Sequence, residues 1–380
     1  MKILHICLAA HYTEGMAYQD NQLPDQNAKD GHEVVVVSDC FKYDGSRLIE
    51  VQEEDKVLPS GVRLIRLQYD RVINKYISSK VRKVKKLKCI ISNEKPQVIV
   101  FHGVAGWEML TSAKYKENHA NVKLYIDSHE DFHNSGRFWV SRLIQYRLFN
   151  RLIVNRIKRN VDKFLYITYE SKNFLSHMYG LREDEMEFYP LGGFIVDRYV
   201  KTQCASSIRA RHNFLDSDIL IIHTGKLDEP KKTRELILAF MKVESQRLKL
   251  LIIGSIPKER EQILFPLIER DKRILFLGWK RGEELREYLA GADLYFQPGT
   301  QSATMQNAVC SGTPVALYPY PSHTFYQQDN VFYVKDIADY IGVFERILQD
   351  DTLLPKMSEA SYKIAFEQLD YKVLAARLYV

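Results

Sequence analysis

Short apolar runs of strand length alternate with helix-forming segments along almost the whole chain, and this alternation limits the folds open to it. Runs of about four to eight apolar residues bounded by turn residues are typical of buried strands. Strands separated by helices pair in parallel, because the chain must cross over before it can run in the same direction again. The sequence therefore predicts an α/β protein with doubly wound parallel sheets. The expected strands are 2–8, 33–38, 62–67, 96–101, 123–126, 163–167, 186–189, 219–223, 248–253, 274–277, 292–297 and 315–318.

A segment rich in glycine and proline divides this series in two. Residues 189–199 (YPLGGFIVDRY) read as a linker, and a second alternating series begins at residue 219. A chain of 380 residues is long enough for two domains with full cores. We expect Rossmann-like domains at 1–190 and 191–360 that face each other across a cleft, and a C-terminal helix at 361–380 that packs back on the first domain.

The composition is that of a globular protein in a reducing compartment. Hydrophobic residues make up 46% of the chain and charged residues 27%, and no apolar run reaches the length of a membrane span. His5 interrupts the N-terminal run MKILHICLAA, so a signal peptide is not expected. The five cysteines are scattered, which argues against a disulfide framework and against a zinc site. These features favour a cytoplasmic location.

The stretch 296–318 (FQPGTQSATMQNAVCSGTPVALY) is expected to place a helix N-terminus at the edge of a sheet. It reads as the end of a strand, a loop of breaker residues at 298–302, a helix over 303–311 that Gly312 ends, and another strand. The free N–H groups and the positive end of the helix dipole make such a terminus a site for an anion.

The loop 224–232 (TGKLDEPKK) has the composition of a diphosphate site. Lys226 and Lys231 supply charge between a strand end and a helix start, and Gly225 permits close approach of the backbone. The Walker A spacing is absent. A solvated basic turn that caps a helix is the alternative interpretation.

A polar loop at 127–132 (DSHEDF) follows the expected strand 123–126, where α/β sheets carry their sites. His129 is the candidate functional residue in this loop, and a simple surface histidine is the alternative. His5, His102 and His223 end or interrupt apolar runs, so we expect them to be packing residues. No set of histidines and cysteines has zinc spacing.

Two segments of the first domain are strongly basic. Residues 79–91 and 137–159 are each expected to form one helix, and the second has seven basic residues and no acidic one. Trp139, Leu143, Tyr146, Ile153 and Ile157 follow a 3.6-residue period, and we expect this arc to pack on the sheet. The surplus charge favours contact with an anionic membrane surface. Nucleic acid is not an expected partner, because residues 1–190 hold 29 Lys and Arg against only 24 Asp and Glu, and no nucleic-acid motif occurs.

Four motifs, in order, resemble those of a known family. KDGHEVVVVS is similar to R-x-G-H-E-V-x-V-x-T, and GKLDEPK to G-R-L-x-x-x-K. ILFLGW followed by ELREYLAGADLYFQPG is similar to F-L-G and E-L-x-x-x-Y-x-x-A-D-x-x-x-x-P, and QNAVCSGTPVAL to E-A-M-A-C-G-x-P-V. Nearly the whole chain thus resembles the retaining GT-B glycosyltransferases of the family 4 type (glycosyl transferases group 1). PGTQS also resembles the loop of some bacterial surface-polysaccharide transferases.

The resemblance implies a hexosyltransferase that needs no metal or other cofactor. It would move a sugar with retention from a nucleotide-sugar, a UDP-sugar above all, to a glycan or polyprenyl-linked acceptor in surface-polysaccharide synthesis. The basic segments favour a peripheral position at the inner face of the membrane. Lys226 and Lys231 would stabilise the leaving diphosphate, and His129 would bind a sugar hydroxyl or orient the acceptor. No enzyme nucleophile is implied. The implied donor-binding residues are Gly15, Gly225, Leu277, Gly278, Gln301, Ser302, Ala303, Thr304 and Asn307.

The chain departs from the family at the E-x7-E pair that flanks the donor sugar. Counting back from Gly312 places the second position of the pair at Asn307. The first falls at Gly299, or at one of its neighbours if the loop has a different length, so both carboxylates are missing. A weakly active or non-catalytic partner subunit of a transferase complex is therefore one alternative function. A nucleotide-sugar 2-epimerase is another. An oxidoreductase is not expected, because the G-x-G-x-x-G fingerprint is missing.

Overall fold

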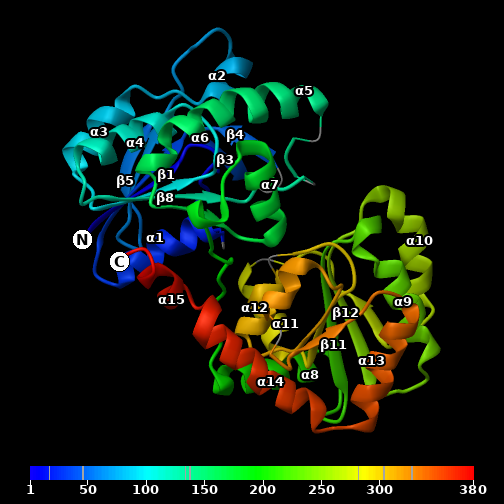
Figure 1. Cartoon of the computed structure of the whole chain (residues 1–380). Coiled ribbons are helices and arrows are strands. Elements are labelled where there is room, and N and C mark those ends of the chain that lie inside the picture. The colour runs from blue at the N-terminus through cyan, green and yellow to red at the C-terminus, as the bar shows by residue number, and fades with distance from the viewer. Residues whose placement is uncertain are drawn as a thin grey trace. The chain divides into compact units, whose positions relative to one another are not determined.

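The chain forms two compact units in the computed structural model, which describes residues 1–16, 18–44, 47–132, 134–136, 138–280, 282–302, 304–326 and 328–380. The first unit consists of Met1–Pro190 together with Leu374–Val380, and the second of Leu191–Val373. Each unit contains a parallel sheet that is covered by helices (Figure 1).

The first unit is built on an eight-stranded sheet with the order β10-β9-β8-β7-β1-β2-β6-β5. All of its strands run parallel except β5, which pairs antiparallel with β6 at one edge. The order reverses between β1 and β7, and ligands of such sheets bind where the loops after these strands diverge. The strands are β1 Lys2–Cys7, β2 Glu33–Asp39, β5 Glu54–Val57, β6 Arg63–Leu67, β7 Val98–His102, β8 Lys123–Ser128, β9 Lys163–Tyr166 and β10 Met186–Phe188, with a separate hairpin of β3 Phe41–Asp44 and β4 Arg47–Glu50.

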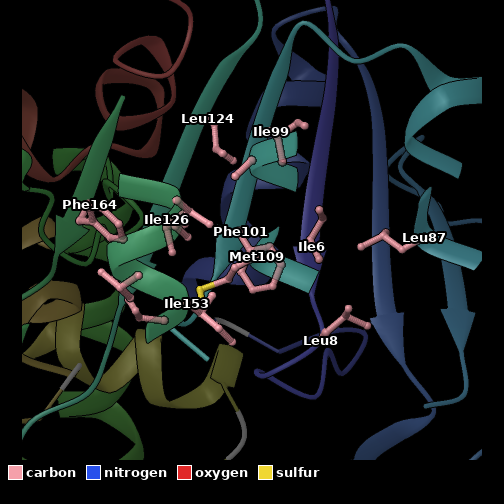
Figure 2. Close-up of a cluster of buried hydrophobic side chains, with 14 of the residues drawn as sticks. Ile6, Leu8, Leu87, Ile99, Phe101, Met109, Leu124, Ile126, Ile153 and Phe164 are labelled. Carbon is pink, nitrogen blue, oxygen red and sulfur yellow. The ribbon is translucent and has the colours of Figure 1, made fainter. Parts of the chain in front are cut away.

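The core of the first unit lies between this sheet and its helices. Figure 2 shows Ile6, Phe101 and Ile126 from three neighbouring strands beside Met109 and Ile153 from two helices, and all five side chains are buried. Apolar contacts of this kind supply most of the stability of a helix–sheet layer. The helices are α1 Gln19–Lys29, α2 Lys75–Val81, α3 Lys86–Glu94, α4 Glu108–Asn118, α5 Trp139–Ser141, the π-helix Arg142–Asn150, α6 Arg151–Ile157 and α7 Tyr169–Tyr179.

The second unit has a six-stranded sheet of order β13-β12-β11-β14-β15-β16, with every strand parallel. Neighbouring residues of one strand enter separate cores: Ile221 packs in one cluster and Ile222 in the other. Helices therefore cover both faces, and the predicted doubly wound α/β fold is confirmed. The elements are α8 Arg198–His212, β11 Ile219–Lys226, α9 Thr233–Lys242, β12 Leu248–Ser255, α10 Lys258–Glu269, β13 Ile274–Phe276, α11 Gly282–Gly291, β14 Leu294–Gln297, α12 Thr304–Cys310, β15 Val315–Leu317, β16 Val331–Tyr333, α13 Ile337–Gln349 and α14 Leu353–Ile364.

The expected single helix over 79–91 is wrong. Arg82 adopts a left-handed conformation with a φ of 50°, which ends α2, and α3 begins only at Lys86. Because proline is tolerated in the first turn of a helix, the sequence also predicts that the first helix starts near Pro24, and this prediction is wrong. That helix, α1, begins at Gln19. Pro24 therefore lies in its interior and not in its first turn, where proline is favoured.

The segment expected as one helix over 137–159 changes its winding along its length. It runs from α5 through the π-helix into α6, while Arg137 lies outside the described residues. Tyr146 and Ile153 are buried as expected, but Trp139 and Leu143 are 75% and 53% exposed. A π-helix turns less per residue than an α-helix, so residues before it rotate away from the face that residues after it present. The expected packing of Trp139 and Leu143 on the sheet is therefore wrong.

The last residues of the chain, Leu374–Val380, belong to the first unit, whereas α14 and the chain up to Val373 belong to the second. The hydroxyl of Tyr379 donates to Asp30 at 2.7 Å and accepts from Asn27 at 2.8 Å, and the hydroxyl of Tyr189 donates to the carbonyl of Leu374 at 2.7 Å. Among the described residues, every helix is too short or too polar to cross a bilayer.

Gly312 ends α12 with a φ of +65°, and a Cβ built on it would lie 2.2 Å from the ring of Tyr362. We expect Gly312→Ala to lower the free energy of unfolding by about 3 kcal/mol, because it adds both left-handed strain and a steric clash. Gly342 in α13 has open space around it, so Gly342→Ala should instead add about 0.5 to 1 kcal/mol. Urea unfolding followed by circular dichroism measures both. Equal effects of the two substitutions would contradict this account.

Candidate active site

Two loops of the second unit meet at the carboxyl edge of its sheet, where the strand order reverses between β11 and β14. β11 ends in Gly225 and Lys226, and the loop 298–302 follows β14. Gly225 has a φ of +129°, and a Cβ on it would lie 2.9 Å from Cε of Lys231. Gly225 was predicted to let a ligand approach the backbone, but in the structure the side chain of Lys231 occupies the space beside it.

Lys231 is a buried cation that ties the two loops together. It is 5% exposed, and its Nζ donates to the carbonyl oxygens of Thr300 at 2.9 Å and Gln301 at 3.5 Å. Burial lowers the pKa of Lys231 to about 8, so the ammonium stays mostly charged at neutral pH. An ammonium group has three N–H donors, and these two contacts leave one for an anion. Lys231 can thus hold the loop and still contribute charge.

A cluster of hydroxyl groups fixes the start of α12. The hydroxyl oxygen of Thr304 lies 2.6 Å from that of Ser302 and 2.8 Å from that of Tyr295, and it accepts from Thr224 at 3.0 Å. Tyr295 donates in turn to the side-chain oxygen of Gln297 at 2.6 Å. The predicted sugar ligands Ser302 and Thr304 are therefore held in one arrangement before any ligand binds.

Gly299 lies at the first position of the family pair, and the structure leaves no space there for a carboxylate side chain. A Cβ built on Gly299 would lie 2.1 Å from the carbonyl oxygen of Pro230, and the N–H of Thr300 donates to that same oxygen at 3.1 Å. The loop therefore rests directly on the backbone before Lys231. A glutamate at position 299 would need the loop to lift away from it.

The other predicted site residues of this unit lie at the end of β11, in the turn after β13, in the loop after β14 and in α12. The N–H of Leu277 donates to Ile252 and the carbonyl of Gly278 accepts from Gly254, each at 2.9 Å, so a base would have to use the other main-chain groups of this turn. Lys226 is exposed at the end of β11, while Gln301 and Asn307 are half-buried. Ala303 lies outside the described residues.

A chain of buried polar side chains runs through the first unit to its carboxyl edge. His5 Nε2 lies 2.8 Å from Asn27 Oδ1, and His5 Nδ1 lies 3.0 Å from His102 Nε2. His102 Nδ1 then lies 2.5 Å from Asp127 Oδ2. At its other end, Asn27 donates to Tyr379 at 2.8 Å. The expectation that His5 and His102 are packing residues is confirmed, but they also bond to each other.

The hydrogen-bond partners determine which ring nitrogens of His5 and His102 carry a proton. Asn27 Oδ1 can only accept, so His5 donates from Nε2 and accepts at Nδ1, which makes His102 a donor at both nitrogens. Burial lowers the pKa of His5 to about 3, so His5 is neutral. Burial opposes the charges on His102 and Asp127 as well, yet their mutual attraction raises the pKa of His102 and lowers that of Asp127. His102 and Asp127 therefore form a buried imidazolium–carboxylate pair.

His129 lies beside this pair, as its position after β8 predicted. Its Nε2 is 3.8 Å from Asp127 Oδ2, and its side chain is 43% exposed, so the ring can meet a ligand. Burial opposes protonation of His129, but Asp127 raises its pKa overall. The neighbouring Glu130 accepts from the hydroxyl of Tyr179 at 3.0 Å, and burial raises the pKa of Glu130 to about 7. The edge thus presents a carboxyl group that changes charge near neutral pH, next to a histidine whose pKa is raised.

A buried arginine that the sequence did not point to binds the loop that carries Gly15. Arg66 is 1% exposed and donates to the carbonyl of Tyr12 at 2.9 Å, to Glu14 at 2.8 Å and to Glu54 at 2.8 Å. Gly15 itself is exposed, with a φ of +78°. The second arginine of the strand RLIRL was the available signal, since a cation inside a buried strand must have partners.

Two Rossmann-like units, each with polar and charged residues at the carboxyl edge of a parallel sheet, define the GT-B class of glycosyltransferase folds. Residues 25–192 match the family model described as Glycosyltransferase Family 4, and residues 218–350 match the model described as Glycosyl transferases group 1. Together these matches identify the chain as a group 1 glycosyltransferase.

Similar solved structures share the fold along the whole chain. Sucrose-phosphate synthase from Thermosynechococcus elongatus matches with a TM-score of 0.69 at 16% identity and covers 100% of this chain and 97% of its own. HepE from Anabaena, solved in complex with UDP, has a TM-score of 0.69 at 14% identity and covers 100% and 98%. A curated relative, N-acetyl-alpha-D-glucosaminyl L-malate synthase from Bacillus anthracis, is 22% identical over 56% of this chain and 58% of its own length. The match thus spans little more than half of that relative.

The buried pair of His102 and Asp127 should make stability depend on pH. The raised pKa of His102 stabilises the fold below the histidine's unfolded value of about 6.5, and the lowered pKa of Asp127 does so above its unfolded value of about 3.9. We expect Asp127→Asn to cost about 3 kcal/mol near pH 5, and less at lower and at higher pH.

The measurement is urea unfolding of wild type and Asp127→Asn from pH 3 to pH 8. Taking the difference between the two curves removes most of the contribution of His5, whose lowered pKa acts with the opposite sign. His119→Gln is the control, because His119 is an exposed histidine of the same unit. A difference that does not vary with pH would show that the pair is not charged.

Proposed function

We propose that the protein transfers a hexose from a UDP-sugar to a glycan or lipid-linked acceptor, with retention at the anomeric carbon, in the synthesis of surface polysaccharide. One observation carries the proposal. The exposed Lys226, the buried Lys231 and the hydroxyl-rich loop before α12 converge at the point where the second sheet reverses its strand order. Family matches over both units support the class of reaction, and the UDP complex of HepE supports the class of donor.

In the proposed reaction, the bond between C1 of the sugar and the β-phosphate oxygen of UDP breaks. The acceptor oxygen bonds to C1 on the same face, and its proton leaves with the departing phosphate. Lys226 and Lys231 stabilise the charge that develops on the diphosphate, with backbone N–H groups near Ser302 and Thr304, and the proposal routes no step through a metal ion. Preorganised donors of this kind lower the barrier because they need not reorient as the charge forms.

We assign three further roles to residues at the two sheet edges. His129 in the first unit binds a sugar hydroxyl or orients the acceptor, and Asp127 behind it holds the ring. The ring of the uracil base packs near the turn at Leu277 and Gly278. Gln301 and Asn307 contact sugar hydroxyls with amide groups that both donate and accept. The relative from Bacillus anthracis is named an N-acetyl-alpha-D-glucosaminyl L-malate synthase, but with 22% identity it does not specify this chain's acceptor.

The direct test is a panel of UDP- and GDP-sugars, scored first by thermal stabilisation and then by sugar release and transfer. A purified protein that neither binds UDP nor cleaves any nucleotide-sugar would overturn the proposal. Two specific results would replace it. An isomerised nucleotide-sugar formed without acceptor would indicate a 2-epimerase. Activity that appears only with a co-expressed transferase would indicate a partner subunit, a candidate that the missing carboxylates at Gly299 and Asn307 favour.

Lys226→Ala should weaken UDP binding by about ten-fold, the usual loss for one charge-assisted contact. Lys226 is exposed and its removal leaves the loops intact, so the thermal unfolding of the free protein should not change. Titration calorimetry with UDP gives the affinity. Lys242→Ala is the matched control, since Lys242 is an exposed lysine at the C-terminal end of α9. Equal affinities of the two variants would remove Lys226 from the site.

A further inference from the structure

Residues 138–152, a helical segment from Trp139 onward, present a large apolar surface to solvent. Trp139 is 75% exposed, Ile144 and Leu148 are each 56% exposed, and Leu152 is 62% exposed. Exposed apolar residues that occur singly are ordinary, but contiguous ones mark a binding surface. The exposed members of this surface, which we call the outer face, are Phe138, Trp139, Val140, Leu143, Ile144, Leu148 and Leu152.

The spacing of the outer face makes it continuous. Val140, Ile144, Leu148 and Leu152 follow one another at intervals of four residues through α5, the π-helix and the start of α6. The wider turn of a π-helix brings residues at this interval close to one line. Tyr146, Ile153 and Ile157 of the same helical segment are buried, so this one segment has a buried face and an exposed apolar face.

The charge around the outer face has one sign. Residues 137–159 contain seven Lys and Arg and no Asp or Glu. Arg156 and Arg159 are exposed, whereas Arg142 donates to the carbonyl of Gly136 at 3.0 Å and Arg147 lies 2.7 Å from His177. A second basic segment of the same unit, around α2, also exposes apolar side chains, with Tyr76 at 72% and Ile73 at 66%. The unit therefore combines exposed apolar and cationic side chains on two elements.

We propose that the outer face docks on the surface of an anionic phospholipid bilayer, with the helical segment lying in the plane of the interface. Its apolar side chains would enter the boundary between headgroups and acyl chains, and its arginines would meet lipid phosphates. Trp139 suits this depth, because an indole ring is apolar with one polar N–H group. The proposal goes beyond sugar transfer and does not depend on it.

The charge decides between a bilayer and a second copy of the chain. In a two-fold dimer the same patch must face itself, which would bring two sets of arginines together with no carboxylate from either helical segment. Nucleic acid would satisfy the arginines but gives no reason for a continuous apolar row, since phosphate contacts dominate such binding. An anionic bilayer satisfies both features at once.

Co-sedimentation of the full-length protein with vesicles tests the proposal. We expect binding to phosphatidylcholine vesicles that contain phosphatidylglycerol and little binding to pure phosphatidylcholine. Ile144→Ser/Leu148→Ser/Leu152→Ser should weaken binding at least ten-fold. Arg156→Gln/Arg159→Gln should weaken it by about five-fold for each charge removed, and added salt should reduce that effect. Leu215→Ser is the matched control, because Leu215 is 67% exposed in the second unit.

A second readout does not depend on sedimentation. In a Trp107→Phe/Trp279→Phe background, Trp139 is the one remaining indole, and its emission should shift to shorter wavelength when anionic vesicles are added. Thermal unfolding of each variant without lipid shows that it is folded. Unchanged vesicle binding by the triple serine variant, or loss of exposed surface through dimers that form without lipid, would overturn the proposal. Neither result bears on nucleotide binding, which is measured separately.

Discussion

Buried charge sets the shape of the candidate site loops in both units. A cation taken out of water must find acceptors, because the penalty for leaving it unpaired is several kcal/mol. Lys231 finds them in the carbonyls of Thr300 and Gln301, and Arg66 finds them in Tyr12 and Glu14. In each case the acceptors belong to a loop at the carboxyl edge of a sheet. The loops are thus held from within before a ligand arrives, as catalysis by preorganised groups requires.

Local pattern predicted the strands other than β3, β4, β5 and β16, and it predicted the edge at which the site residues lie. Parallel strands end at a common edge, so loops after strands of one sheet could be expected to share it, and Lys231 and the loop 298–302 do. The partnerships of His5, His102 and Asp127 could not be predicted in the same way, because they depend on strand order. His102 pairs directly opposite Asp127 only because β7 and β8 are neighbours in this register. The available signal was three polar residues inside otherwise buried strands.

The glycine at position 299 changes the shape of the candidate donor site. The resemblance to the family predicts a carboxylate near this position, but the backbone of Gly299 rests on Pro230 with no room for a side chain. The same close approach brings the carbonyl of Thr300 to the ammonium of Lys231. Loss of the carboxylate and burial of the lysine are therefore linked. Because the loop lies this close to the backbone before Lys231, main-chain carbonyl oxygens contact the ammonium group where the family has a negatively charged side chain nearby.

The winding of a single helical segment decides which surface the first unit offers to solvent. A regular α-helix over residues 139–157 would place Trp139 and Leu143 on the same face as Ile153, and that face would be buried. The π-helix shifts the phase between the two halves, so Ile153 stays in the core while Trp139 and Leu143 turn outward. No local residue signal marked this change, because π-helical winding follows from packing rather than from periodicity. Apolar side chains that a regular helix would have buried are thereby left beside arginines, and this juxtaposition makes a lipid surface the partner that fits both.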